Sequence, residues 1–267
     1  MPAHPAYGEV RPVTGFASVV LRDNPGAMEL DGTNTWILRA PGSGTAVVVD
    51  PGPPKSKAHV ATVVEAAGDV ELTLITHRHH DHTGAIKTAV AQTGAPVRAY
   101  LDKYCRGAEP LADGEVIEAA GLTITAWHTP GHTGDSMSFL VEHDGERAIL
   151  TGDTILGAGT TVLDPKDGGL SDYLASLDRL IADASDAVLL PGHGPDHPEL
   201  GPVAQFYRQH REERLDQIRG VLDDMGKTAG QAKPMAVVRK AYADVDKKLW
   251  PAARMSVKAQ LEYLRGL

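Results

Sequence analysis

One short stretch constrains the fold of this chain more than any other: residues 76–84, with the sequence THRHHDHTG. It follows an apolar run at residues 72–75 that predicts a buried strand, and residues 85–91 behind it predict a helix. The string therefore lies at the C-terminal end of a strand, where an α/β sheet usually presents its chemistry. We expect an α/β fold with a reactive sheet edge.

The side chains in this string have the types and spacing of metal ligands. His77 and His79 are two residues apart, so an extended or turn segment can point both imidazoles the same way. Asp81 and His82 enter the next helix and offer a carboxylate and a third imidazole from another direction. Imidazole and carboxylate suit a borderline ion such as zinc. Four such groups are too many for one tetrahedral ion that also keeps a water, so the string predicts half of a two-metal site.

A histidine-rich, solvated loop is the alternative, and it would be preferred for any one of these histidines alone. Three further predicted strands argue against it, because each also ends in a turn that carries a candidate ligand. These are His132 after residues 122–127, Asp153 after residues 148–150 and His193 after residues 187–190. Four strand ends therefore deliver seven candidate metal ligands: His77, His79, Asp81, His82, His132, Asp153 and His193.

Other polar residues near these turns have simpler interpretations. Asp50 ends a predicted strand and is followed by Pro51-Gly52, so it is either an acceptor for a ligand histidine or a plain turn residue. His128 lies within a strand end and is expected to pack rather than bind metal. Surface roles are expected for the histidines that lack a ligand pattern: His59, His80, His143, His197 and His210.

The hydrophobic periodicity predicts strands mixed with helices up to residue 199 and helices alone beyond it. Expected strands cover residues 17–21, 34–39, 46–50, 97–101, 122–127, 137–141, 148–150 and 187–190, with a hairpin joining the sixth and seventh. Expected helices cover residues 57–67, 171–181, 203–225, 235–242 and 253–264.

The charge balance changes sign along the chain. Residues 1–199 carry 13 Lys and Arg against 27 Asp and Glu, whereas residues 200–267 carry 13 against 8. We therefore predict two domains, 1–199 and 200–267. The basic module could help to hold an anionic substrate, and reversing the charges of Arg208, Arg211 and Arg214 is expected to raise KM more than it lowers kcat. An ordinary helical appendage with solvated charges is the alternative.

Composition limits the setting of the protein. The hydrophobic share of 42% supports a sizeable core. Cys105 is the only cysteine, which excludes an internal disulfide and fits a reducing compartment, and we expect it to be an ordinary side chain. The first residues lack a signal pattern and no apolar run approaches a membrane span. We expect a cytoplasmic protein with no membrane partner, and the oligomeric state stays open.

The ligand series, from His-x-His-x-Asp-His to the Gly-His and Gly-Asp turns, resembles that of the metallo-β-lactamase-fold hydrolases. The resemblance implies an αβ/βα sandwich with two Zn²⁺ per chain at one edge of the two sheets. It implies that His77, His79 and His132 hold one ion, that Asp81, His82 and His193 hold the other, and that Asp153 bridges them. Asp81 would also be catalytic, because the carboxylate closest to the nucleophile can orient a hydroxide or shuttle a proton.

Three further segments resemble the branch called beta-lactamase-like protein two: residues 32–36, 152–162 and 191–195. That branch carries a small C-terminal domain of the winged-helix type. Here the last predicted helix runs to the end of the sequence, so we expect an all-helical, winged-helix-like domain without a β wing.

Departures from related families narrow the choice. True metallo-β-lactamases have a cysteine or serine where this chain has Asp153, and flavodiiron proteins have a glutamate where it has His79. Nucleases with a large inserted domain place it between the last two ligands, and only 39 residues separate Asp153 from His193. Sulfur dioxygenases share the His-x-His-x-Asp-His string and therefore remain.

Two divalent ions about 3.5–4 Å apart lower the pKa of a shared water, and the resulting bridging hydroxide can attack a carbonyl carbon or a phosphorus atom. The preferred function is cleavage of phosphodiesters in single-stranded RNA. The alternatives are a glyoxalase II-like hydrolase of a small-molecule ester or thioester, and an iron-dependent sulfur dioxygenase. A non-enzymatic winged-helix binding protein would leave the seven ligands unexplained.

Overall fold

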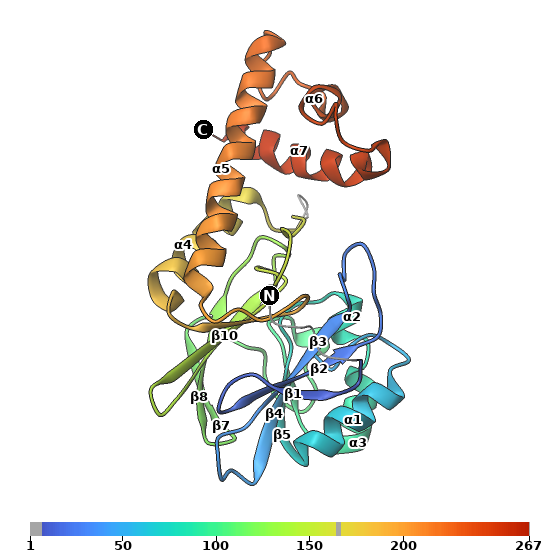
Figure 1. Cartoon of the computed structure of the whole chain (residues 1–267), viewed down its shortest axis with the longest axis vertical. Helices are drawn as coiled ribbons and strands as arrows, with labels where there is room; N and C mark the ends of the chain where they lie inside the picture. Colours follow the sequence, from blue (N-terminus) through green and yellow to red (C-terminus); the bar gives the residue numbers. More distant parts are fainter. Residues whose placement is uncertain (1–6, 164–166, 267) are drawn as a thin grey trace.

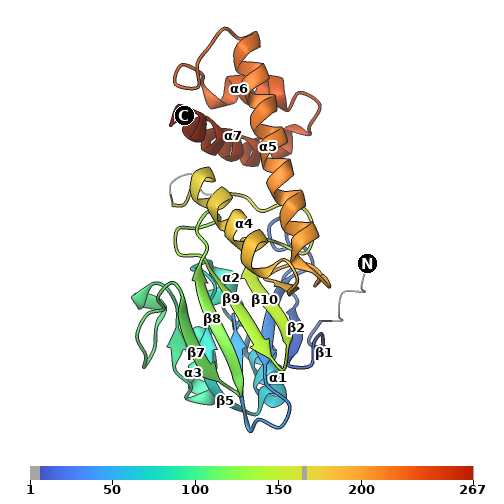
Figure 2. The same cartoon turned by 90° about the vertical axis from the view of Figure 1, so that its left-hand side faces the viewer.

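The computed structural model describes residues 7–163 and 167–266. Two β-sheets pack face to face, helices cover their outer faces, and a helical domain stands on one end of the resulting sandwich (Figures 1 and 2). This is the αβ/βα architecture that the sequence predicts. No helix in the described part of the chain is long and apolar enough to cross a membrane.

The first sheet has six strands in sequence order. They are β1 (Val10–Pro12), β2 (Ala17–Arg22), β3 (Thr33–Leu38), β4 (Thr45–Val49), β5 (Asp69–Leu74) and β6 (Val97–Arg98). The first four strands are antiparallel, and β4, β5 and β6 run parallel. Parallel neighbours need crossovers, which are supplied by α1 (Lys57–Ala67) and then by α2 (His80–Thr83) with α3 (Ile86–Thr93).

The second sheet has five strands in the order β11-β10-β9-β8-β7. They are β7 (Glu115–Ala119), β8 (Leu122–His128), β9 (Met137–His143), β10 (Glu146–Gly152) and β11 (Val188–Pro191). The expected β9–β10 hairpin is present, with Glu146 opposite His143. The helix α4 (Leu170–Ala184) carries the chain from β10 to the parallel strand β11.

Apolar side chains fill the space between the two sheets. The fully buried Leu38, Val49 and Leu74 of the first sheet meet Ile124 and Phe139 of the second. Because alternate residues of a strand face opposite sides, the other faces pack on helices: α1 covers the first sheet and α4 the second. Two rigid layers therefore meet at one edge, where the loops after β5, β8, β10 and β11 come together.

The helical domain is built from α5 (Leu200–Asp224), α6 (Pro234–Ala241) and α7 (Trp250–Arg265), with a short 3₁₀ turn η2 (Lys247–Leu249) before α7. The described chain after β11 contains no strand. The helix α5 contributes to two cores. Leu200, Tyr207 and Leu215 pack with α4, whereas Ile218 and Leu222 pack with α6 and α7.

Three strands of the structure differ from the expectation. β1 and β7 were not expected; β7 is an edge strand whose alternating exposure leaves Val116 56% exposed, so its segment resembles a polar loop. The strand expected at residues 97–101 ends at Arg98, because the chain then turns into a 3₁₀ segment, η1 (Asp102–Tyr104). The expected domain boundary at residue 199 stays a prediction, and the helix that starts there joins both cores.

Candidate metal centre

The seven residues predicted as ligands converge at one end of the sandwich. The segment after β5 supplies four of them, the turn between β8 and β9 supplies one, and the ends of β10 and β11 supply one each. In chain order they are His77, His79, Asp81, His82, His132, Asp153 and His193. Their candidate ligand atoms form two groups, and within each group all the atoms lie within 4.8 Å of one another.

The first group contains three imidazoles and one carboxylate. His79 Nδ1 lies 3.0 Å from His77 Nε2 and 3.0 Å from His132 Nε2. Asp153 Oδ2 lies 3.9 Å from His77 Nε2 and 3.6 Å from His132 Nε2. Four donor atoms of the kind that zinc prefers therefore face a common point.

The second group contains two imidazoles and the carboxylate of Asp81. Asp81 Oδ2 lies 3.1 Å from His82 Nε2 and 3.1 Å from His193 Nε2, and these two nitrogens are 3.3 Å apart. Asp153 also reaches this group, because its Oδ1 lies 3.5 Å from His82 Nε2 and its Oδ2 lies 3.3 Å from His193 Nε2. Asp153 is thus placed between the two groups.

These distances fit metal coordination better than hydrogen bonding. A tetrahedral ion with bonds of about 2.0–2.1 Å holds neighbouring ligand atoms about 3.3–3.4 Å apart, which is close to the spacings in both groups. Asp153 Oδ1 is buried without any hydrogen-bond partner. A buried carboxylate oxygen without a hydrogen-bond partner destabilises the folded chain. A metal ion bound to this oxygen would supply the missing partner.

The other ring nitrogen of four histidines is held from outside the centre. The contacts are His77 Nδ1 to Thr76 Oγ1 at 3.1 Å, His82 Nδ1 to Asp50 Oδ2 at 2.7 Å, His132 Nδ1 to Val162 O at 2.7 Å and His193 Nδ1 to Gly32 O at 2.9 Å. Such contacts fix the ring orientation and leave Nε2 free to bind an ion.

Asp50 anchors the strand end from which the histidine string departs. Its carboxylate accepts hydrogen bonds from the Thr76 amide at 2.9 Å and the Thr76 hydroxyl at 2.6 Å, besides the His82 ring. Its φ of +55° is unusual for a residue other than glycine. Of the two interpretations of Asp50, the structure supports that of an acceptor for a ligand histidine.

A second anchor holds the loop that carries His193, and the sequence analysis missed it. The Asn34 side-chain amide donates to Pro191 O at 3.0 Å and to Gly194 O at 2.9 Å, and Trp36 Nε1 donates to Pro191 O at 3.0 Å. A side chain at Gly192 would meet Asp153 Oδ1 at 2.6 Å, so only glycine fits there. Residues 32–36 therefore supply the side chains that hold the loop at residues 191–195, and this loop needs a glycine next to the metal centre.

Burial and charge divide the histidines into two electrostatic types. In the first group, burial lowers the pKa of His79 to about 4, and it lowers the pKa of His77 and His132 as well. The first group therefore offers neutral rings ready to bind an ion. In the second group, burial would also lower the pKa of His193, but the carboxylates of Asp153 and Asp81 outweigh it and raise that pKa to about 10.

The second group has the opposite balance. Burial would lower the pKa of His82, but Asp81, Asp50 and Asp153 raise it well above its usual value. Burial would raise the pKa of both Asp81 and Asp153, but the neighbouring histidines hold both well below their usual range. An ion that binds here must displace protons from His82 and His193, since only the neutral ring is a ligand.

The surface role expected for His59 is wrong. His59 is buried, only 6% exposed, and its Nε2 lies 2.8 Å from Thr35 Oγ1. Because that hydroxyl donates to Asp50 O at 2.6 Å, the His59 ring must donate to it. His59 falls on the apolar face of α1 with Val60 and Val63, so its helical position was a signal available in the sequence.

His128 has the packing role that was expected. Its ring stacks on Tyr100 with centroids 4.3 Å apart, and its Nε2 lies 2.7 Å from Gly134 O. His80 is exposed, as expected. Cys105 is buried and its thiol contacts Ala99 O at 3.4 Å, as fits an ordinary side chain.

Comparison with known proteins assigns the family. The profile of the Metallo-beta-lactamase superfamily matches residues 28–193, and that of the Beta-lactamase associated winged helix domain matches residues 234–265. The chain belongs to the metallo-beta-lactamase superfamily and is a metal-dependent hydrolase of that superfamily. The fold and the C-terminal domain type expected from the sequence are both confirmed.

Similar proteins cover nearly the whole chain. A Drosophila melanogaster protein named Beta-lactamase-like protein 2 homolog is 32% identical over 94% of this chain and 89% of its own length. The Atrochrysone carboxyl ACP thioesterase of Aspergillus chevalieri is 35% identical over 85% of this chain and 72% of its own length. The crystal structure of a beta-lactamase domain protein from Burkholderia ambifaria has a TM-score of 0.78 at 18% identity, covering 99% of this chain and 92% of that one.

Proposed function

We propose that this protein uses a two-zinc centre to cleave single-stranded RNA. The observation that carries this substrate is a basic surface on the helical domain, beside the end of the sandwich that holds the candidate ligands. A hydrolase of small thioesters is the second candidate, because one relative is named as a thioesterase.

The proposed ion ligands are those that the two groups define. His77, His79 and His132 would hold the first ion, Asp81, His82 and His193 the second, and Asp153 both. Zinc suits this set because it contains nitrogen and oxygen donors and no thiolate. When bound, such a pair supplies a Lewis acid and a hydroxide near neutral pH.

Asp81 is the carboxylate best placed to handle a proton. Its side chain is 19% exposed, whereas that of Asp153 is 10% exposed. Its Oδ2 also accepts a hydrogen bond from Thr33 Oγ1 at 3.3 Å, which fixes the carboxylate toward the centre. The neighbouring histidines keep Asp81 ionised, so it can orient a nucleophile by accepting its hydrogen bond.

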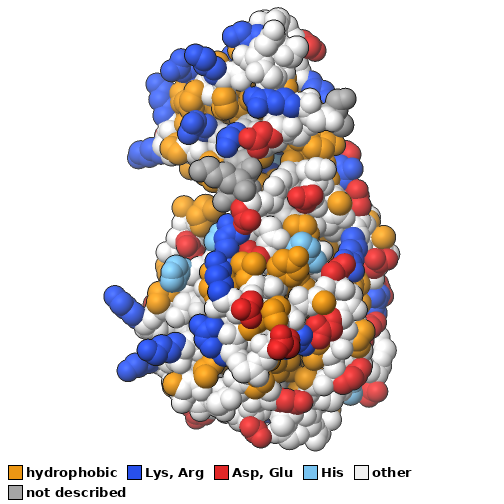
Figure 3. All heavy atoms as spheres, turned by 180° about the vertical axis from the view of Figure 1, so that it is seen from behind, with side chains coloured by type: hydrophobic (Ala, Val, Ile, Leu, Met, Phe, Trp, Pro, Cys, Tyr) orange, Lys and Arg blue, Asp and Glu red, His pale blue; other side chains and the backbone are white. Residues whose placement is uncertain are grey.

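The basic surface lies on and around α6 and α7. Residues 226–258 contain eight Lys and Arg and only two Asp. Seven of the eight are exposed and form no ion pair with a described residue: Lys227, Lys233, Arg239, Lys240, Lys247, Lys248 and Arg254. Figure 3 shows Lys and Arg side chains gathered on the helical domain, above the hollow between it and the sandwich. Cations without an ion-pair partner, on a domain that stands on the sandwich, suit a phosphate backbone.

The test compares RNA cleavage by wild type and by His79→Ala, purified identically, on a single-stranded RNA, its duplex and an acyl thioester. We expect metal-dependent cleavage of the single strand by the wild type alone, with the duplex a poor substrate. Equal cleavage by both preparations would identify a contaminating nuclease. Thioester turnover without RNA cleavage would replace the ribonuclease proposal by the second candidate.

A further inference from the structure

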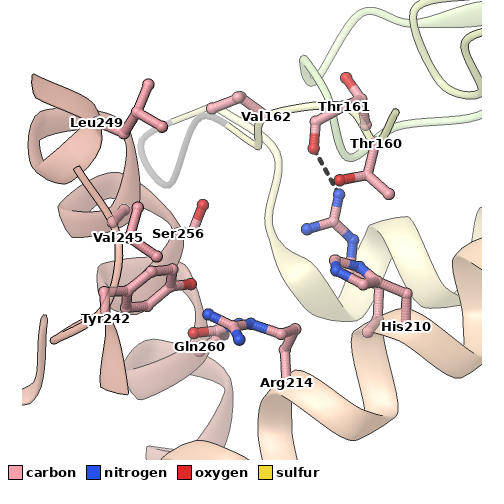
Figure 4. A pocket seen from close by; sticks show the side chains of 12 residues that line it. Thr160, Thr161, Val162, His210, Arg214, Tyr242, Val245, Leu249, Ser256 and Gln260 are labelled. Atoms are coloured by element: carbon pink, nitrogen blue, oxygen red, sulfur yellow. Dashed lines mark hydrogen bonds between the residues drawn. The ribbon is translucent and has the colours of Figure 1, made fainter. Parts of the chain in front are cut away.

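A cavity of about 430 Å³ separates the helical domain from the sandwich close to the metal centre. One wall is the loop at residues 160–162, and the others come from α5, the segment after α6, and α7 (Figure 4). The lining residues are Thr160, Thr161, Val162, His210, Arg211, Arg214, Tyr242, Val245, Leu249, Ala253, Ser256 and Gln260.

The charge of this lining is unlike that of the chain. The chain has a net charge of −9, yet the lining contains two arginines and no Asp or Glu. Both arginines come from α5, one turn apart. In such surroundings a guanidinium lacks the carboxylate partner that buried cations usually have.

The two arginines differ in what they contact. Arg211 is 6% exposed, donates to Thr161 O at 2.5 Å and lies over the Tyr173 ring, so it ties α5 to the loop. Arg214 lies over the Tyr242 ring, with its guanidinium carbon 4.3 Å from the ring centroid. Arg214 forms no ion pair with any described residue, so its guanidinium can accept a ligand.

Unsatisfied polar atoms also collect in this cavity. His210 Nδ1, Arg211 Nε and Gln260 Oε1 are buried without a hydrogen-bond partner, and they make up three of the eight such atoms in the described residues. Gln260 is only 3% exposed and lies beside Arg214 in Figure 4. Buried polar atoms without partners are costly, and this wall keeps hydrogen-bonding capacity that the described residues leave unused: Arg211 Nε is a donor and Gln260 Oε1 an acceptor.

The cavity wall is also part of the support of the metal centre. Thr161 Oγ1 lies 3.0 Å from His132 Nδ1, and Val162 O lies 2.7 Å from the same nitrogen. A ligand in the cavity is therefore separated from a candidate metal ligand by one layer of side chains. The loop at residues 160–162 therefore has the cavity on one side and His132 on the other.

We propose that this cavity binds an anionic oxygen group, a phosphate or a carboxylate, with Arg214 as its recognition residue. Arg211 contributes a donor, Gln260 donates through its side-chain NH2 group, and Ser256 lies on the same wall. The proposal concerns anion binding itself, and only its kinetic test rests on the proposed function. A phosphate fits the RNA candidate, whereas a carboxylate fits an acyl substrate.

Arg208 provides a matched control on the same helix. It lies away from the cavity and is paired with Asp178 at 2.8 Å and with Glu212 at 2.7 Å. Arg208→Gln and Arg214→Gln therefore remove the same charge from α5, and only the second removes it from the cavity. The charge pattern of the sequence grouped Arg208 with Arg211 and Arg214, but its two ion pairs and its place outside the cavity predict that its loss leaves anion binding unchanged.

The binding test locates the anion directly. Crystals of the metal-loaded protein are soaked with inorganic phosphate or acetate, and the affinities are measured by titration calorimetry at low salt. We expect an anion between Arg214 and Gln260 in wild type and Arg208→Gln, and an affinity at least 10-fold weaker in Arg214→Gln. Preference for phosphate or for acetate distinguishes the two sources. An anion found only at the metals, or equal affinities in all three proteins, would overturn the proposal.

The kinetic test uses two phosphodiester substrates of different size. Arg214→Gln is expected to raise KM for a short oligonucleotide about 10-fold with kcat within twofold, and to leave KM for bis(4-nitrophenyl) phosphate unchanged. A loss of kcat on both substrates would instead indicate damage to the metal centre. If no RNA is cleaved by any variant, the proposed function fails while the crystallographic result still decides the anion site.

Discussion

Asp153 has a position that no other candidate ligand shares, because its two oxygens approach both groups. We therefore predict that Asp153→Ala loses more activity and more bound metal than Asp50→Ala. Loss of an outer contact such as that of Asp50 is expected to cost about 10–100-fold. Metal content and kcat of both variants give the measurement. Similar losses in the two would contradict the bridging assignment of Asp153.

His59 gives a prediction about pH. Its folded pKa is lowered from 6.5 to about 4, by burial first and by Arg22 second. Below pH 6.5 the unfolded chain gains a proton that the folded chain refuses, so stability falls as the pH drops from 6.5 toward 4. Between pH 7 and 5 this loss amounts to about 2 kcal/mol.

The variant His59→Gln removes this proton and keeps a donor for Thr35. Urea unfolding at pH 7 and pH 5 is expected to show a smaller fall in stability for His59→Gln than for wild type. His143→Gln, at the tip of the β9–β10 hairpin, is the control and should behave like wild type. An unchanged pH dependence in His59→Gln would show that this ring does not cause the loss.

At the residue scale, prediction from sequence depended on distance along the chain. The ligand string at residues 77–82 is local, and each of His132, Asp153 and His193 follows a recognisable strand. The anchors of those ligands are remote: Gly32 holds His193 from 161 residues away, and Asn34 holds Pro191 from 157 residues away. Neither pairing leaves a local pattern, because it exists only once the two sheets have packed.

Among the elements, α5 supports the segment after β10 as well as the helical domain. The hydroxyl of the buried Tyr207 accepts a hydrogen bond from the Leu156 amide at 2.9 Å. Tyr207→Phe is expected to destabilise the protein by about 1–3 kcal/mol, because it leaves this buried amide without a partner. The neighbouring Phe206 is 57% exposed, so Phe206→Ala is expected to stay within about 0.5 kcal/mol of wild type. Denaturant unfolding checks both, and equal effects would contradict this role of Tyr207.

Helices were predicted more accurately than strands. The helix expected at residues 57–67 has those bounds, since its stripe of Val60, Val63 and Ala67 marks one buried face. The edge strand β7 was missed because an edge strand has a partner on one side only and tolerates exposed residues. The effect of charge reversal at Arg208, Arg211 and Arg214 on KM stays a prediction; of the three, only Arg214 lines the cavity without an ion pair or a backbone hydrogen bond to a described residue.

For the whole molecule, the metal content distinguishes the zinc hydrolase from the iron-dependent dioxygenase. Elemental analysis of protein from unsupplemented cells is expected to give two zinc ions per chain. Removing them with a chelator should lower Tm, because an ion that binds only the folded chain stabilises it. One iron and no zinc per chain would favour the dioxygenase alternative. A chain that holds no metal at all would contradict the assignment of the centre.

The helix α5 is continuous, so it holds α6 and α7 at a fixed distance from the sandwich. One inserted residue in an α-helix adds about 1.5 Å and turns everything beyond it by about 100°. Such an insertion between Leu215 and Ile218 would swing α7 and Arg214's partner Tyr242 away from the loop at residues 160–162. Lengthening α5 by one residue therefore cannot widen the cavity slightly, because it also rotates one wall of the cavity away from the other. Relatives of this protein with other substrates are expected to keep the phase of this helix and to change the side chains of α6 and α7.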